Sequence, residues 1–196
     1  MEDKKKLSPE KVFKAYSKGL EFNARLNLDE EVENNENFFI GKQWENVQAN
    51  GLPTPVFNFL KRITLFTVAS VTTENLKLNA TPLGNSGSKG KFYKMTNIIN
   101  DEFASIFEHN RIGNLTREMM RNAAVDCDGC TYTYWDPDIE TGQTAKGGIV
   151  TEVVENTRVF FGNPNDRRVN KQPYIILERR LMLDEAKDKA KDLGKS

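Results

Sequence analysis

The sequence predicts an α+β fold in which helices pack with a small antiparallel β-sheet. Between residues 9 and 125, apolar residues recur at three- and four-residue spacing, which is typical of amphipathic helices. Between residues 131 and 179, short runs of β-branched and aromatic residues are separated by Gly, Pro and Asn, which is typical of strands joined by turns. With 196 residues, 38% hydrophobic and 29% charged, the chain can bury one or two cores and expose charged helices.

Charge and composition narrow the class of protein. The 28 Lys and Arg residues balance the 28 Asp and Glu residues, and a dedicated nucleic-acid module is not expected because phosphate binding needs concentrated positive charge. The longest apolar run, Ile63 to Val71, is interrupted by hydroxyl residues and is too short to cross a membrane. The first residues lack the apolar segment of a secretory signal, and two cysteines are compatible with a reducing, cytosol-like compartment.

Residues 1–82 are expected to form an N-terminal helical segment with a buried helix and a short strand. Ser8 at the cap and Pro9 at the first helical position predict where the first helix begins. Residues at helical spacing form its apolar face: Phe13, Tyr16, Leu20, Ala24 and Leu28. The acidic run from Asp29 to Glu36 is interpreted as a solvated continuation of helix, because its spacing brings no set of ligands together for a divalent cation.

The stretch from residue 35 to residue 82 contains a strongly apolar helix. A loop around Pro53 and Pro55 leads into it, and it is expected over about residues 57–74, with apolar side chains on nearly every side. Such a helix is expected to be buried on several sides, as the core of this chain or of an assembly that contains it. Trp44 and the aromatic residues before it are expected to strap this helix. The alternation from Leu76 to Ala80 predicts a half-buried strand that ends near Pro82.

Residues 83–90 are expected to form a flexible loop, because Gly, Ser and Asn dominate and offer little to bury. The glycines resemble those of a phosphate-binding loop. However, the Lys-Ser or Lys-Thr pair that would contact phosphate and magnesium is missing, so a nucleotide site is not predicted.

Residues 91–182 are expected to hold two helices followed by an antiparallel meander. The apolar spacing predicts the helices over about 92–109 and 115–125. Residues 131–135 and 149–154 predict a hairpin with a wide polar tip, and residues 158–161 and 173–179 predict further strands. Residues 183–196 predict a charged final helix, capped by Asp184, that either packs on something outside this sequence or marks where a longer protein has been cut.

No catalytic, cofactor-binding or metal-binding residue is assigned from the sequence, and no enzymatic activity is expected. The sharpest candidate is the Cys-Asp-Gly-Cys run at residues 127–130. Zinc would need a second pair of ligands, and a redox motif would open a helix after a strand, so two small, half-buried residues flanking a Gly turn are the favoured interpretation. His109, the only histidine, is expected to stabilise a helix C-terminus. Asp126 and Asp128 are not expected to converge on a substrate.

Two clusters of residues carry a family resemblance. The clusters are Phe38, Phe39, Gly41, Gln43 and Trp44, then Pro53, Pro55, Val56, Phe57 and Asn58. They resemble the aromatic-pair, Gly, Gln-Trp and Pro-x-x-Asn signature near the N-terminus of tailed-bacteriophage portal proteins, especially the podovirus-like branch. Later segments resemble that branch in their order: Leu76 to Pro82, Ser86 to Gly90, Phe92 to Val125, Ala124 with Asp128 and Gly129, Tyr132 to Pro137, Gly142 to Ile149, and Arg158 to Asn165.

The resemblance implies a portal wing-like fold and a structural role in the head-tail connector at one capsid vertex of the virion. It implies that the full-length protein forms a dodecameric homo-oligomeric ring, assembled in the host cytoplasm, whose partners are the terminase motor, the capsid and tail or adaptor proteins. Double-stranded DNA would pass through the ring during packaging and ejection without sequence-specific recognition, and no membrane would be involved. The match begins near Glu30 and lacks the tunnel helices, so a wing-region fragment is expected. The alternative is a non-enzymatic protein-interaction module of phage or host origin.

Overall fold

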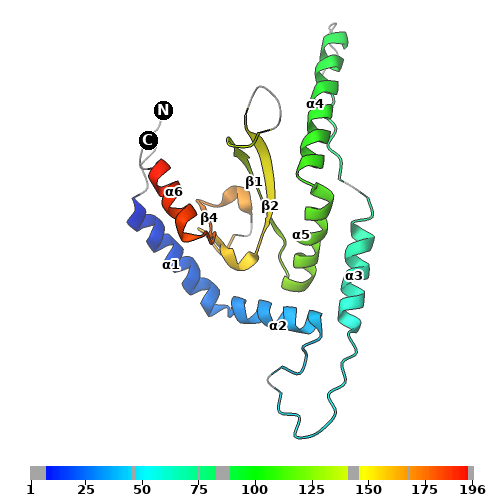
Figure 1. Cartoon of the computed structure of the whole chain (residues 1–196), viewed down its shortest axis with the longest axis vertical. Helices are drawn as coiled ribbons and strands as arrows, with labels where there is room; N and C mark the ends of the chain where they lie inside the picture. The colour runs from blue at the N-terminus through cyan, green and yellow to red at the C-terminus, as the bar shows by residue number, and fades with distance from the viewer. Residues whose placement is uncertain are drawn as a thin grey trace. The chain divides into compact units, whose positions relative to one another are not determined.

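The computed structural model describes residues 8–45, 47–74, 76–82, 89–140, 146–166 and 168–193 (Figure 1). Within these residues it contains six α-helices and two separate two-stranded antiparallel sheets, which confirms the predicted α+β class. Contacts group the chain into two compact units, one formed by Glu30–Asn156 and the other by the segments before and after it. This grouping differs from the linear segmentation expected from the sequence, because the two ends of the chain belong to the same unit.

The unit that joins both ends of the chain is organised around Phe160. It contains α1 (Pro9–Arg25), β3 (Val159–Phe161), β4 (Ile175–Leu177) and α6 (Leu183–Leu193), with short 3-10 turns at Asn156–Arg158 and Val169–Lys171. Phe160 is 2% exposed, and the ring of Tyr16 meets it edge-on at 5.2 Å between centroids. Gly19 permits this packing, because a Cβ there would lie 2.7 Å from the Phe160 ring.

Two side-chain hydrogen bonds also stabilise this unit. The Tyr16 hydroxyl donates to the Glu178 carboxylate at 2.8 Å, just after β4. Buried Asn23 donates from its side-chain amide to the Thr157 carbonyl at 3.4 Å. Both bonds join α1 to residues more than one hundred positions away, so they fix the helix on β3 and β4. Ser8 occupies the predicted cap position of α1, but its side chain makes no capping hydrogen bond.

The second unit contains α2 (Leu28–Ile40), α3 (Phe59–Val71), α4 (Lys89–His109), α5 (Ile112–Asp126), β1 (Cys130–Asp136) and β2 (Gly148–Val154). Here α5 has α3 on one side and the β1–β2 hairpin on another (Figure 1). The hairpin pairs Cys130 with Val154 at one end and Asp136 with Gly148 at the other. The side-chain amide of Asn110, between α4 and α5, donates to the Ile149 carbonyl and accepts from the Thr151 amide, and so covers part of the open edge of β2.

Several expectations need correction. The four strands do not form one meander, because β1 pairs only with β2 and β3 only with β4 within the described residues. Residues 76–80 form no strand; instead Ala80 hydrogen-bonds through its amide and carbonyl to the Asn100 side chain on α4. The loop expected at 83–90 lies largely outside the described residues, and α4 already begins at Lys89. No described helix is long and apolar enough to span a bilayer.

Candidate interaction surface

The structure buries few of its apolar side chains. Among the described residues, only Val68 and Phe160 are hydrophobic side chains that count as buried. Many large apolar residues in the second unit are instead more than 40% exposed, and they gather on α3, on the loop before it and on the N-terminal half of α4. Exposed apolar residues that are neighbours on one helix face make this part of the chain the candidate interaction surface, whereas scattered apolar residues need no explanation.

α3 packs on α5 with one face and leaves the opposite face bare. Val68, 8% exposed, and buried Thr72 form the packed face. Phe59, Ile63 and Phe66 are spaced by four and three residues, so they form a stripe on the other side, and Phe66 is 74% exposed. We call these three residues the α3 stripe. Burial of this helix inside the chain was the first alternative expected from the sequence, and it is wrong because α5 covers only one side.

Asn58 fixes the start of α3. Its side-chain oxygen accepts from the Lys61 amide at 3.1 Å, which satisfies one of the free N–H groups at the helix N-terminus. Its side-chain amide donates to the Phe39 carbonyl at 2.8 Å, in the last turn of α2. Gly41 lies beside it with φ of +94°, and a Cβ at this position would lie 3.3 Å from the Asn58 amide nitrogen. Two residues of the sequence signature therefore meet at the junction between α2 and α3.

Trp44 closes the loop between α2 and α3. Its indole N–H donates to the Pro55 carbonyl at 3.1 Å, and its side chain is 43% exposed. The hydrogen bond therefore joins the two sides of the loop. The hydrogen bond of the indole is made to the loop before Asn58, whereas Phe39 contacts α3 directly, with the Lys61 ammonium 5.6 Å from the centroid of its ring.

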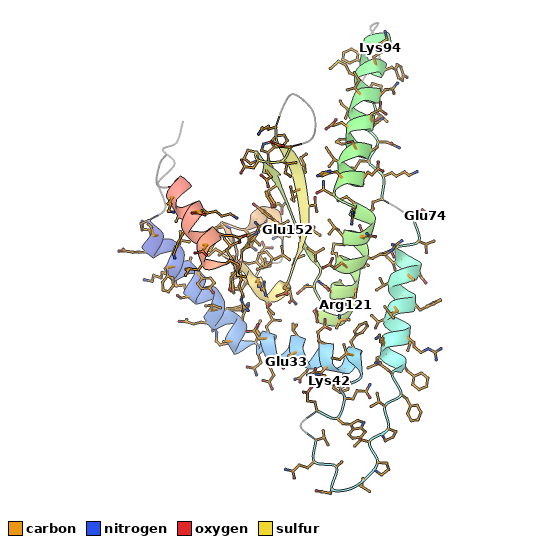
Figure 2. All side chains as sticks on the ribbon, viewed as in Figure 1. Glu33, Lys42, Glu74, Lys94, Arg121 and Glu152 are labelled. Carbon is orange, nitrogen blue, oxygen red and sulfur yellow. The ribbon has the colours of Figure 1, made fainter. Side chains whose placement is uncertain are left out.

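A second junction, which the sequence analysis missed, joins α2 to α5. The Arg121 guanidinium forms a bidentate ion pair with the Glu36 carboxylate and lies 4.8 Å from the centroid of the Phe39 ring. Arg121 lies at the end of α5 nearest α2 (Figure 2). Asp126 lies nearby with one carboxylate oxygen buried and without a hydrogen-bond partner, and burial, together with the Glu36 charge, raises the pKa of Asp126 above its ordinary value.

The N-terminal half of α4 carries a second bare apolar face. Phe92, Met95, Ile98 and Ile99 recur at helical spacing and are 42–68% exposed; we call these four residues the α4 stripe. Residues 76–79 lie against another side of α4, where they line an open pocket of about 370 Å³ together with Phe103 and Phe107. The α4 stripe does not include the side chains that line this cavity.

The chemical candidates from the sequence are placed as follows. Cys127 ends α5 with φ of +71° and is exposed, whereas half-buried Cys130 begins β1; both thiols are free. Burial and then Asp128 raise the pKa of the Cys130 thiol, which disfavours its thiolate. The expectation that both cysteines are half-buried is correct for Cys130 only.

Asp126 and Asp128 belong to no cluster of metal-ligand type among the described residues. His109 is the last residue of α4.

Comparisons with known proteins identify no relative of this chain. The chain matches no protein-family model, no curated protein and no solved structure.

Proposed function

We propose that this chain is a structural subunit of a tailed-bacteriophage portal, the ring at the head-tail vertex through which genomic DNA enters and leaves the capsid. The order of the signature residues from Phe38 to Asn58 and of the later segments supports the family. The proposed partners are further copies of the chain, the terminase motor, the capsid and the tail or adaptor proteins. DNA would pass through the assembled ring without sequence-specific contacts, as the balanced charge of the chain suggests.

The bare outer side of α3 carries the proposal. Five apolar side chains on and just before this helix are each more than half exposed: Phe57, Phe59, Leu60, Ile63 and Phe66. At roughly 150–250 Å² for a large aromatic side chain, they expose on the order of 600 Å². A standard protein–protein interface buries about 800 Å² on each partner. A subunit that assembles with its own copies would bury this area, which agrees with the second alternative expected for the helix from the sequence.

The purified chain tests this proposal through its assembly state. Mass photometry and native mass spectrometry should show a closed homo-oligomer whose mass is a multiple of the 22.3 kDa chain. Two-dimensional averages from electron microscopy should show rotational symmetry around a central opening, and the family resemblance predicts twelve copies for the full-length protein. A chain that stays monomeric at concentrations well above about 10 μM, which corresponds to roughly 7 kcal/mol of binding free energy, would contradict the proposal.

A further inference from the structure

We propose that Asn50 is a site of spontaneous covalent modification, in which the Asn50–Gly51 pair closes to a succinimide ring that then opens to aspartate and isoaspartate. The pair belongs to the loop between α2 and α3, which extends beyond the ends of both helices (Figure 1). Asn50 is the only asparagine of the sequence that a glycine follows. The reaction needs water and no enzyme, so the inference does not depend on the proposed function.

A tight turn presents the pair to solvent. The Leu52 amide donates to the Ala49 carbonyl at 2.8 Å, and the two residues between them have φ of +47° and +82°. Positive φ at both central positions is characteristic of a type I′ turn, for which Asn-Gly is a preferred sequence. Both residues are exposed, and a Cβ on Gly51 would meet no described heavy atom within 4 Å. The turn can therefore open without displacing a packed neighbour on this side.

Neither reacting group is held by another described residue. Within the described part of the chain, no hydrogen bond is recorded from the Gly51 amide or from the Asn50 side chain. By contrast, the side-chain amides of Asn58 and Asn110 donate to backbone carbonyls at 2.8 Å and 2.7 Å. Rotation about the Asn50 Cα–C bond brings the Gly51 nitrogen to the side-chain carbonyl carbon. This rotation breaks the exposed hydrogen bond of the turn, which costs little because water replaces it.

The reaction has two balanced steps. The Gly51 amide nitrogen loses its proton to solvent base and attacks the side-chain carbonyl carbon of Asn50. The new C–N bond forms as the bond to the side-chain nitrogen breaks, and ammonia leaves. Water then adds to either ring carbonyl and breaks its bond to the ring nitrogen, which gives aspartate or isoaspartate. Glycine favours the first step, because no Cβ hinders the approach of its nitrogen.

The products change the charge and the backbone of the loop. The 28 Lys and Arg residues balance the 28 Asp and Glu residues, so one new carboxylate leaves the chain with one excess negative charge. This charge appears close to Leu52, which is 73% exposed, on the loop that forms part of the candidate interaction surface. Isoaspartate also adds a carbon to the main chain, inside a loop that the Trp44–Pro55 hydrogen bond closes.

The chain offers a matched position at which the same chemistry should be slow. In the Asp128–Gly129 pair, a Cβ on the glycine would lie 2.5 Å from the Met119 carbonyl oxygen, so this backbone packs on α5. The next residue, Cys130, pairs with Val154 in the hairpin. Asp128→Asn therefore places an asparagine before a packed glycine, for comparison with the open turn at Asn50.

The test is incubation of the purified chain in neutral and mildly alkaline buffers without added enzyme. Ion-exchange chromatography should resolve an acidic species that forms faster at higher pH, because the attacking nitrogen must lose its proton. Peptide mapping by mass spectrometry should find in this species an acid in place of the amide at residue 50, with isoaspartate among the products. The rate should lie within about tenfold of that in a free peptide of residues 48–53, which corresponds to about 1.4 kcal/mol in the barrier.

Two variants serve as controls. Asn50→Gln keeps a neutral amide, but its longer side chain does not close the same ring, so the acidic species should be lost. In Asp128→Asn, residue 128 should be modified at least about tenfold more slowly than residue 50 of the same chain.

The outcomes decide the inference and leave the portal proposal to its own test of assembly. Aspartate and isoaspartate at residue 50, both lost in Asn50→Gln, would support it. A residue 50 that stays unmodified after the free peptide has reacted would overturn it, because the turn would then hold the pair. Aspartate without isoaspartate would exclude the ring, and equal rates at residues 50 and 128 of Asp128→Asn would show that the open turn does not select the site. Either result would also overturn the inference.

Discussion

Asn58 illustrates how one side chain can set the angle between two helices. Its oxygen caps α3 through Lys61, and its amide nitrogen binds the Phe39 carbonyl in α2. Replacement by alanine removes both bonds, so Asn58→Ala should lower the free energy of unfolding by about 1–3 kcal/mol, the combined range for a cap and a partly buried hydrogen bond. Chemical denaturation followed by far-ultraviolet circular dichroism measures this change.

The aspartate variant separates the two roles of Asn58. Asn58→Asp keeps an oxygen that accepts from Lys61, and its charge suits a helix N-terminus, but it cannot donate to the Phe39 carbonyl. It should therefore be more stable than Asn58→Ala and less stable than the parent chain. Equal stability of the aspartate variant and the parent chain would show that the bond to α2 contributes nothing.

Asp126 gives the fold a predictable pH dependence. Burial, followed by the Glu36 charge, raises its pKa in the folded chain, so the folded state binds this proton more tightly than the unfolded state does. The associated stability is fully present below the unfolded-state pKa and is lost as pH rises through the folded-state pKa. Asp126→Asn should therefore be more stable than the parent chain at neutral pH, by less than about 1 kcal/mol because the group is partly solvated.

Unfolding curves of both chains across acidic and neutral pH measure this effect. The advantage of Asp126→Asn should shrink as pH falls, since the parent carboxyl becomes neutral as well. Asp126→Asn retains the backbone carbonyl of residue 126 that accepts from Asn156, so this contact is matched in the two chains. An advantage that grows toward acidic pH would show that the sign of the pKa shift is wrong.

At the scale of single elements, two helical glycines provide a matched pair. A Cβ at Gly19 in α1 would lie 2.7 Å from Phe160, whereas a Cβ at Gly90 in α4 would meet open space. Alanine has the higher helix propensity at both positions, by up to about 1 kcal/mol in a helix interior. Gly19→Ala should nevertheless destabilise the chain by about 1–3 kcal/mol, because overpacking against the buried ring outweighs this gain.

Gly90→Ala should be neutral or slightly stabilising, by up to about 1 kcal/mol, since only the propensity term acts there. Thermal unfolding of the two variants side by side measures the difference. If both substitutions changed stability in the same direction and by the same amount, then close packing of α1 on Phe160 would not explain the glycine at position 19.

The sequence predicted most helices and the hairpin because their signals are local. Helical spacing indicated α1, α4 and α5, and the alternation around Tyr132 and Val150 indicated β1 and β2. Residues 76–80 carry the same alternation but pair with no strand, since pairing depends on a partner strand that local pattern does not supply. The Glu36–Arg121 ion pair was also missed, because it joins residues 85 positions apart with no spacing rule between them.

At the scale of the whole molecule, burial was the property that sequence could not assign. An apolar helix indicates that some surface will cover it, but the sequence does not say whether that surface belongs to the same chain. In this structure α5 covers the side of α3 that carries Val68, and the α3 stripe is exposed. The distinction matters for stability, because few hydrophobic side chains of the described residues are buried within the chain itself.

This shortage of buried apolar surface leads to the last prediction, that the stability of the chain depends on its concentration. If assembly buries the α3 stripe, only the folded state binds its neighbours, and mass action raises the apparent stability as concentration rises. The thermal midpoint of the parent chain should increase by several degrees over about a hundredfold range of concentration, since roughly 1 kcal/mol shifts the midpoint of a chain of this size by 2–4 °C. Phe66→Asp should unfold at a lower and constant midpoint, because its folded monomer gains nothing from its neighbours. A thermal midpoint of the parent chain that does not change with concentration would show that the small cores within one chain are enough to stabilise its fold.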